Sequence, residues 1–185
     1  MRTCRHLVHL AAAALLMALP AAAPAQTKSV AEILQALQGA NAGPKVRSLS
    51  REASRGISIE GPLPQDLDLP QVDLTVNFEF NSARLTTDAM LTLRALGIAM
   101  QHETLQSASF QIAGHTDAVG EDAYNIELSE RRAATVAAFL ANHFGVDAIR
   151  LNAVGYGETQ LLYPQMPNNE LNRRVTIINV DPLMN

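Results

Sequence analysis

The sequence has no tryptophan, and aromatic residues make up only 4% of its 185 positions. Proteins that bind single-stranded nucleic acid stack the bases on aromatic side chains, so this composition disfavours such a platform. The only cysteine, Cys4, leaves the rest of the chain without a disulfide or thiolate chemistry. Acidic residues outnumber basic ones, and the formal net charge is −4. A negative chain is a poor match to a polyanion, and we expect no nucleic-acid partner.

Residues 1–25 have the pattern of a secretory signal peptide, with a basic start and the apolar stretch Leu7–Leu19. The small residues Ala23-Pro24-Ala25 fit a cleavage site, so we expect the mature protein to begin near Gln26. The alternative is a membrane anchor, but the apolar run is shorter than the ~20 residues that a spanning helix needs. Cys4 precedes this run, so it cannot be the lipid-bearing cysteine of a bacterial lipoprotein. We therefore expect no transmembrane segment in the mature chain.

Residues 26–71 are predicted to form an N-terminal helix followed by a proline-containing linker. Val30, Ile33, Leu34 and Leu37 have helical spacing, in a stretch too short to be stable alone. This helix docks on its own domain or on an envelope partner that contacts residues 26–60. Residues 40–61 have a local basic bias, typical of a solvated segment or of contact with an anionic polymer or headgroup. The prolines at 62, 64 and 70 favour an extended linker, which places the domain boundary at about residue 72.

Residues 72–185 are predicted to form one α/β domain. Strict alternation predicts a half-buried strand over 72–80. A helix is expected from Thr86 or Thr87 to about Gln101, followed by a strand that ends at Gly114. A second helix is expected over about 123–143. The last two strands are expected over 151–156 and 175–180, with a loop over 161–170 between them. Alternation of this kind indicates helices packed on a mixed four-stranded sheet.

Two charged residues fifteen positions apart mark the candidate site. Asp117 lies in the loop after the second strand, where α/β proteins often place ligand sites. Arg132 lies four residues from both Leu128 and Val136, so it belongs to the buried face of its helix, whereas Arg131 points about 100° away. A guanidinium on such a face needs an anion or several acceptors. Asp117 and Arg132 either form a buried salt bridge that fixes the loop, or share a pocket for the ammonium and carboxylate of an amino acid.

Five short segments follow one another in a distinctive order. They are NFEFNSARL (77–85), GHTDAVG (114–120), YNIELSERRA (124–133), GYGET (155–159) and NRRV (172–175). In this order and spacing, residues 72–180 resemble the OmpA-like peptidoglycan-binding domain family. The stretch before Val72 is too short for a membrane barrel of eight strands at ~10 residues each, so we expect a soluble member. The resemblance implies a sandwich of helices on a mixed sheet.

The resemblance also implies a ligand. The family binds the diaminopimelate residue of the peptidoglycan stem peptide noncovalently, which implies that Asp117 holds its ammonium and Arg132 its carboxylate. Asn81, Asn125 and Arg173 lie on motif positions that line the pocket in relatives. We therefore expect a non-catalytic protein of the Gram-negative cell envelope, located in the periplasm either free or in association with the outer membrane, with peptidoglycan as its partner.

Two other classes of function remain as alternatives. One is a protein-interaction adaptor on the same fold, in which Asp117 and Arg132 form only a structural salt bridge. The other is an enzyme, which the pattern disfavours because no serine lies in a nucleophile-elbow motif and no histidine set has metal-ligand spacing. His115 is interpreted as a hydrogen bonder that shapes the loop. We expect no metal and no cofactor.

Overall fold

The computed structural model describes residues 27–39, 62–63, 67–79 and 81–184 of the chain. The predicted signal peptide and the basic stretch at 40–61 lie outside these residues. Within the described ranges, no helix is long and apolar enough to cross a membrane.

Four strands form one mixed sheet, as the sequence predicted. They are β1 (Gln71–Leu74), β2 (Phe110–His115), β3 (Leu151–Gly157) and β4 (Val175–Asn179), and their order in the sheet is β1-β4-β2-β3. β2 and β3 run parallel, whereas β4 pairs antiparallel with both β1 and β2. The parallel pair is joined by a crossover helix, as parallel strands require.

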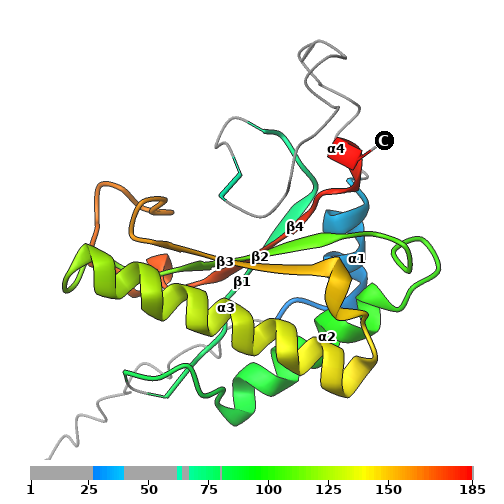
Figure 1. Ribbon diagram of the computed structural model, residues 1–185, viewed down its shortest axis with the longest axis horizontal. Helices are drawn as coiled ribbons and strands as arrows, with labels where there is room; N and C mark the ends of the chain where they lie inside the picture. The colour runs from blue at the N-terminus through cyan, green and yellow to red at the C-terminus, as the bar shows by residue number, and fades with distance from the viewer. Residues whose placement is uncertain (1–26, 40–61, 64–66, 80, 185) are drawn as a thin grey trace, which may run out of the picture.

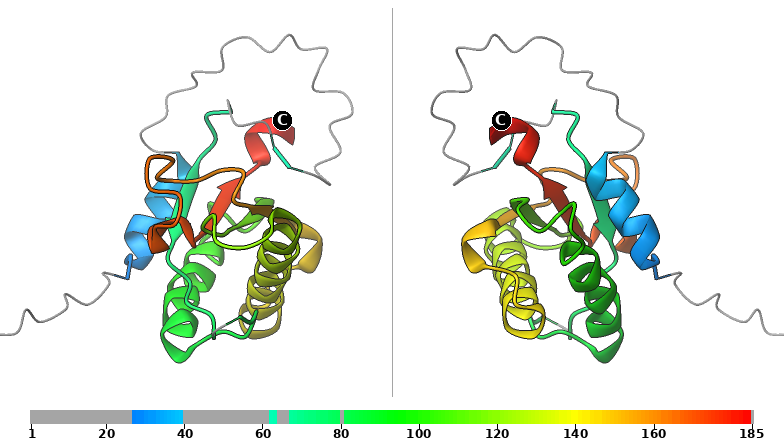
Figure 2. Two further views of the ribbon diagram at one scale, coloured as in Figure 1. Left: turned by 90° about the vertical axis from the view of Figure 1, so that its left-hand side faces the viewer. Right: turned by 90° about the vertical axis from the view of Figure 1, so that its right-hand side faces the viewer.

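Two long helices, α2 (Thr87–Met100) and α3 (Asp122–Phe144), cover one face of this sheet, as Figure 2 shows. Thr86 caps α2 through its hydroxyl, which accepts the Ala89 N–H, and Gly145 ends α3 in the left-handed conformation. The core between the layers contains Val72, Leu74, Leu93, Leu96, Phe110, Ile112, Val136, Leu140, Val175 and Ile177.

The short helix α1 (Val30–Gln38) packs on the same core, against α2 and the edge strand β1 (Figure 1). Ser29 and Glu32 form a capping box at its start. Ile33 and Leu37 have no exposed surface, and the Asn179 side chain donates a 3.0 Å hydrogen bond to the Leu37 carbonyl. Of the two predicted positions for this helix, the structure therefore shows docking on its own domain.

The first strand is shorter than predicted. Pairing with β4 ends where Leu74 meets Val175, although burial continues to alternate through Val76 and Phe78. Met90 of α2 is apolar but lies on the outer face of the helix, where it is 43% exposed. Three short elements were not predicted, namely the 3-10 turns η1 (Ala148–Arg150) and η2 (Glu170–Asn172) and the helix α4 (Asp181–Met184).

Candidate ligand-binding site

Close contact between α3 and the strands fixes the frame of the site. A Cβ added to Gly114 would lie 2.2 Å from the Ser129 carbonyl oxygen, and one added to Gly155 would lie 2.5 Å from the Glu130 nitrogen. Only glycine allows this approach of helix and strand backbones. The Ser129 hydroxyl also accepts a 2.9 Å hydrogen bond from the Gly157 N–H. The next turn of α3, which carries Arg132, is thereby held at the carboxyl ends of β2 and β3.

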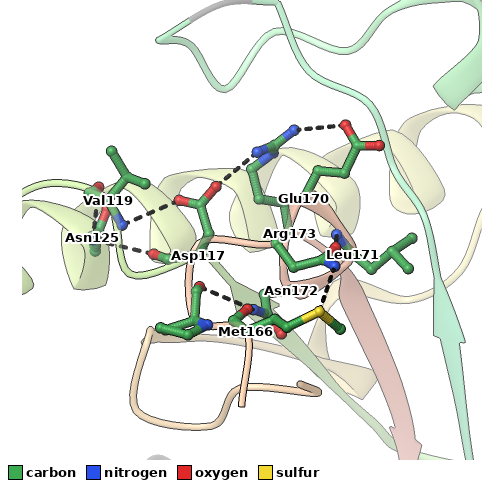
Figure 3. Close-up of polar contacts among 10 residues, drawn as sticks. Asp117, Val119, Asn125, Met166, Glu170, Leu171, Asn172 and Arg173 are labelled. Carbon is green, nitrogen blue, oxygen red and sulfur yellow. Dashed lines mark hydrogen bonds and ion pairs between the residues drawn. The ribbon is translucent and has the colours of Figure 1, made fainter. Parts of the chain in front are cut away.

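Asp117 lies in the loop between β2 and α3, with its side chain only 12% exposed. One carboxylate oxygen accepts a 2.7 Å hydrogen bond from Arg173, and the other accepts the Val119 N–H at 3.4 Å (Figure 3). The loop is fixed from outside because the Ala118 N–H donates to the Pro167 carbonyl at 3.0 Å. The carboxylate is therefore held in position before any ligand arrives.

Asn125 supports this loop from the first turn of α3. It is 3% exposed, and its side-chain nitrogen donates to the Val119 carbonyl at 3.2 Å and the Asp117 carbonyl at 3.4 Å. The same nitrogen donates to Glu158 at 2.7 Å. Asn125 therefore positions the loop that carries Asp117. Its partner Glu158 was not predicted from the sequence.

Arg132 is half-buried on α3 and makes no ion pair with a carboxylate in the described part of the chain. Its Nε–H donates to the Ser82 carbonyl at 3.1 Å, and its guanidinium carbon lies 4.9 Å from the centre of the Phe78 ring. Burial, followed by the positive charge of Arg173, lowers the pKa of Arg132 from its ordinary value. An anion bound beside Arg132 would oppose both effects.

Arg131 points away from the buried face of α3, as its position in the helical repeat predicted. It is exposed, and its Nε lies 3.8 Å from a carboxylate oxygen of Glu127 one turn earlier. Exposed pairs of this kind contribute about 0.3–0.5 kcal/mol in a helix. Arg131 is therefore a natural control for Arg132.

The direct salt bridge between Asp117 and Arg132 is not formed, because Arg173 occupies the position beside Asp117. Arg173 enters from the chain just before β4, and its other terminal nitrogen lies 3.5 Å from Glu170 (Figure 3). The structure thus joins Asp117 to Arg173, the second arginine of the predicted set. Helical phase identifies the face of Arg132, but it carries no information on a competing arginine from another element.

A groove of about 380 Å³, here called the arginine groove, brings Arg132 and Arg173 together. Its lining consists of Thr75, Val76, Asn77, Phe78, Arg132, Glu170, Leu171 and Arg173. Two guanidiniums can bind a carboxylate in this groove, while the Glu170 carboxylate and the neighbouring Asp117 supply acceptors for an ammonium group. The arrangement is suited to a zwitterion.

Asn81 and Asn125 do not line the arginine groove. Asn81 has a positive φ of 50°, and its side-chain oxygen accepts a hydrogen bond from the Tyr124 hydroxyl. Sequence reasoning missed Phe78, Glu170 and Leu171 in the lining. The strict alternation around Phe78 was the one signal available, because it placed this ring on the same face as the core residues of β1.

The His115 side chain contacts the sheet, whereas it was predicted to shape the loop. Its Nε2 lies 3.3 Å from the Thr176 hydroxyl, and its ring stacks on Tyr156 with centres 5.4 Å apart. Burial, followed by the charge of Arg174, lowers the pKa of His115 to about 3, although Asp73 opposes the shift. The imidazole is therefore neutral at physiological pH. No cluster of three metal-binding side chains occurs among the residues that the structure describes.

Two known proteins with similar sequences are outer-membrane proteins by name. Outer membrane porin F of Pseudomonas aeruginosa is 40% identical over 97 residues, which cover 52% of this chain and 27% of that protein. Outer membrane protein P5 of Haemophilus influenzae is 40% identical over 86 residues, covering 45% of this chain and 23% of that protein. The matches thus span about a quarter of the length of these relatives.

Solved structures share the fold. A MotB-like protein from Desulfovibrio vulgaris superposes with a TM-score of 0.51 at 26% identity, covering 58% of this chain and 70% of that one. The periplasmic domain of Helicobacter pylori MotB gives a TM-score of 0.52 at 22% identity, covering 60% and 76%. The sequence model described as "OmpA family" matches residues 77–174, which is more than half of the chain and includes all the residues of the arginine groove except Thr75 and Val76. The chain therefore belongs to the OmpA family.

Proposed function

We propose that this protein binds peptidoglycan noncovalently, through the diaminopimelate residue of the stem peptide, and that it catalyses no reaction. The observation that carries the proposal is Arg132, a half-buried guanidinium without a carboxylate partner in the described chain, facing a groove with a second arginine. Family membership and the position of Asp117 beside this groove support the same ligand.

Each charged group has a role in this proposal. Arg132 binds the ligand carboxylate with its terminal N–H groups, since its Nε–H is engaged with Ser82. Asp117 accepts the ligand ammonium through the lone pairs that Arg173 does not use, because an ionised carboxylate offers about four acceptor positions. Arg173 bridges the two and adds a second positive charge toward the carboxylate.

A pull-down on diaminopimelate-type peptidoglycan tests this function. We expect Asp117→Ala and Arg132→Ala each to lose most of the bound protein, since losing one partner of a charged pair costs about 2–5 kcal/mol of binding. Arg131→Ala is the matched control, because it removes the same charge one position along α3, and it should bind like the wild type. Circular dichroism would check that each variant is folded. Equal losses in the Arg131 and Arg132 variants would contradict the site.

A second candidate is a protein-interaction adaptor on the same fold. The 2.7 Å contact between Asp117 and Arg173 favours it, because the loop carboxylate is already paired without a ligand. Free diaminopimelate distinguishes the two candidates. It should release a wall-binding protein from peptidoglycan, whereas an adaptor would keep its protein partner in the presence of the amino acid.

The proposed location is the periplasm, in association with the outer membrane. The predicted signal peptide and the outer-membrane relatives support this location. An envelope partner that contacts residues 26–60 remains part of the proposal. Such a partner would use residues other than Ile33 and Leu37, because both are buried in the domain core.

A further inference from the structure

We propose that the ligand site continues past the arginine groove, over Leu171, and that this extension binds the amino acids of the stem peptide next to diaminopimelate. The inference rests on the proposed function and adds a second contact region to it. A second groove of about 580 Å³ shares Thr75, Asn77 and Leu171 with the arginine groove. Its other lining residues are Thr27, Lys28, Asp73, Leu74, Asp88, Leu91 and Thr92. We call it the leucine groove.

The lining of the leucine groove fits a short peptide. Leu91 is 57% exposed and Leu171 is 49% exposed, so two large apolar side chains of the lining face solvent, while polar Thr75 and Asn77 belong to the same lining. Pockets for small ligands combine apolar walls with a few polar groups in this way. The far end carries charges of both signs, Lys28 and Asp88, and no aromatic side chain lines the groove. Such a surface offers apolar contact and hydrogen bonds, but no ring face for a sugar.

The floor shared by the two grooves has the geometry for an extended ligand. Residues 75–77 lie beyond the last paired position of β1, where Leu74 meets Val175. The segment is still extended enough for burial to alternate, with Val76 buried between Thr75 and Asn77. The Asn77 carbonyl already accepts hydrogen bonds from the N–H and the hydroxyl of Thr86, so an extended peptide would lie along this segment mainly by placing alternate side chains in pockets. A peptide running over Thr75 and Asn77 would connect the two grooves.

The turn η2 is fixed so that Leu171 stays between the grooves. The Asn169 side chain accepts the Leu171 N–H at 2.8 Å, which caps the turn. The next residue, Asn172, has no exposed surface, and its side chain donates to the carbonyls of Met166 and Pro167 at 3.0 Å (Figure 3). Because these bonds exist without a ligand, a bound peptide pays little to order Leu171.

Volume supports a ligand larger than one amino acid. Pockets of about 300–1,000 Å³ accommodate drug-sized molecules. The arginine groove alone, at about 380 Å³, is sufficient for an amino-acid head group with its neighbouring atoms. The leucine groove then provides the additional contact area for the adjoining peptide.

The test compares two ligands by calorimetry, free diaminopimelate and a tripeptide that ends in diaminopimelate. Wild-type protein should bind the tripeptide about tenfold more tightly, as expected for partial burial of a leucine side chain. Leu91→Ser should remove most of this advantage and leave the affinity for free diaminopimelate unchanged, because Leu91 lines the leucine groove and not the arginine groove. Ile149→Ser is the control, because Ile149 is 89% exposed and lines neither groove.

The outcomes separate this inference from the proposed function. Equal affinities of the wild type for both ligands, with no effect of Leu91→Ser, would overturn the leucine groove and leave diaminopimelate binding intact. Absence of binding to either ligand by the wild type would overturn the proposed function, and the extension with it. Displacement of the tripeptide by glycan strands without stems, in the wild type but not in the Leu91→Ser variant, would assign the groove to sugar and contradict peptide binding.

Discussion

At the scale of single residues, Arg173 is the group that holds Asp117 without a ligand. Arg173→Ala leaves the Asp117 carboxylate, 12% exposed, without its cation. Because the Arg173 side chain is itself 47% exposed, we expect only about 1 kcal/mol of lost stability in urea unfolding. Asp117→Asn added to Arg173→Ala should recover part of the loss. Losses that simply add in the double variant would show that the two side chains do not interact in solution.

The residues of the site were only partly predictable. Spacing from Leu128 and Val136 placed Arg132 on the inner face of α3, and the structure confirms that face. The partner of Asp117 was not predictable from spacing, because Arg173 approaches from the far end of the chain and the choice between two arginines depends on tertiary distances. Asn125 was assigned to the pocket, whereas its buried amide is engaged with the loop backbone.

His115 predicts a pH dependence of stability. Its pKa in the folded protein is about 3, against an ordinary value near 6.5, so between these values the unfolded chain binds the additional proton. The free energy of unfolding should therefore fall as the pH falls below 6.5, by on the order of 1 kcal/mol per unit for this one group.

Urea unfolding of wild type and His115→Gln at pH 7 and pH 5 would measure this effect. The glutamine variant, which cannot titrate in this range, should show a smaller loss on acidification than the wild type. Identical losses in the two proteins would mean that His115 is not the group responsible.

At the scale of elements, the packing of α3 on the sheet depends on glycine. Gly155→Ala should cost about 3 kcal/mol, because the added carbon would lie 2.5 Å from the backbone of Glu130 and the helix would have to move. Gly145→Ala is the comparison. The added carbon would meet nothing within 4 Å, so the only cost is that of holding alanine in the left-handed conformation, about 1 kcal/mol. Thermal unfolding would rank the two, and a smaller cost at Gly155 would contradict the close approach.

The order of strands and helices was predictable because each element has a clear period, and the bounds of α2 and α3 differ from the predicted ones by few residues. The first strand was predicted too long. Alternation from Val72 onward reports burial of every second residue, but it does not report a hydrogen-bonded neighbour, and β4 begins only opposite Leu74. The residues of η2 show no hydrophobic periodicity, so this turn was not predicted.

At the scale of the whole molecule, α1 is part of the domain that contains the site. Leu37 has no exposed surface and its carbonyl is bound by Asn179 of β4. Leu37→Ala should cost about 2–5 kcal/mol through the cavity it leaves. Leu34→Ala, at a partly buried position of the same helix, should cost less. Unfolding followed by a probe on the sheet should detect the loss of stability in both variants. An unchanged unfolding midpoint in the Leu37 variant would mean that α1 is not docked in solution.

The contact between the end of α1 and the start of β1 has a consequence for how the chain tolerates change in length. Gly39 lies against Pro70, since a Cβ added to the glycine would lie 2.9 Å from the proline ring. Gly39 and Pro70 thus meet at one place on the domain, and between them the Leu63 N–H donates to the Tyr156 hydroxyl at 2.7 Å. Closing a longer loop between fixed ends costs only ~0.6 kcal/mol for each doubling of its length. Evolution, or an engineer, can lengthen the chain between Gly39 and Leu63 or insert a reporter into it while the binding grooves keep their geometry.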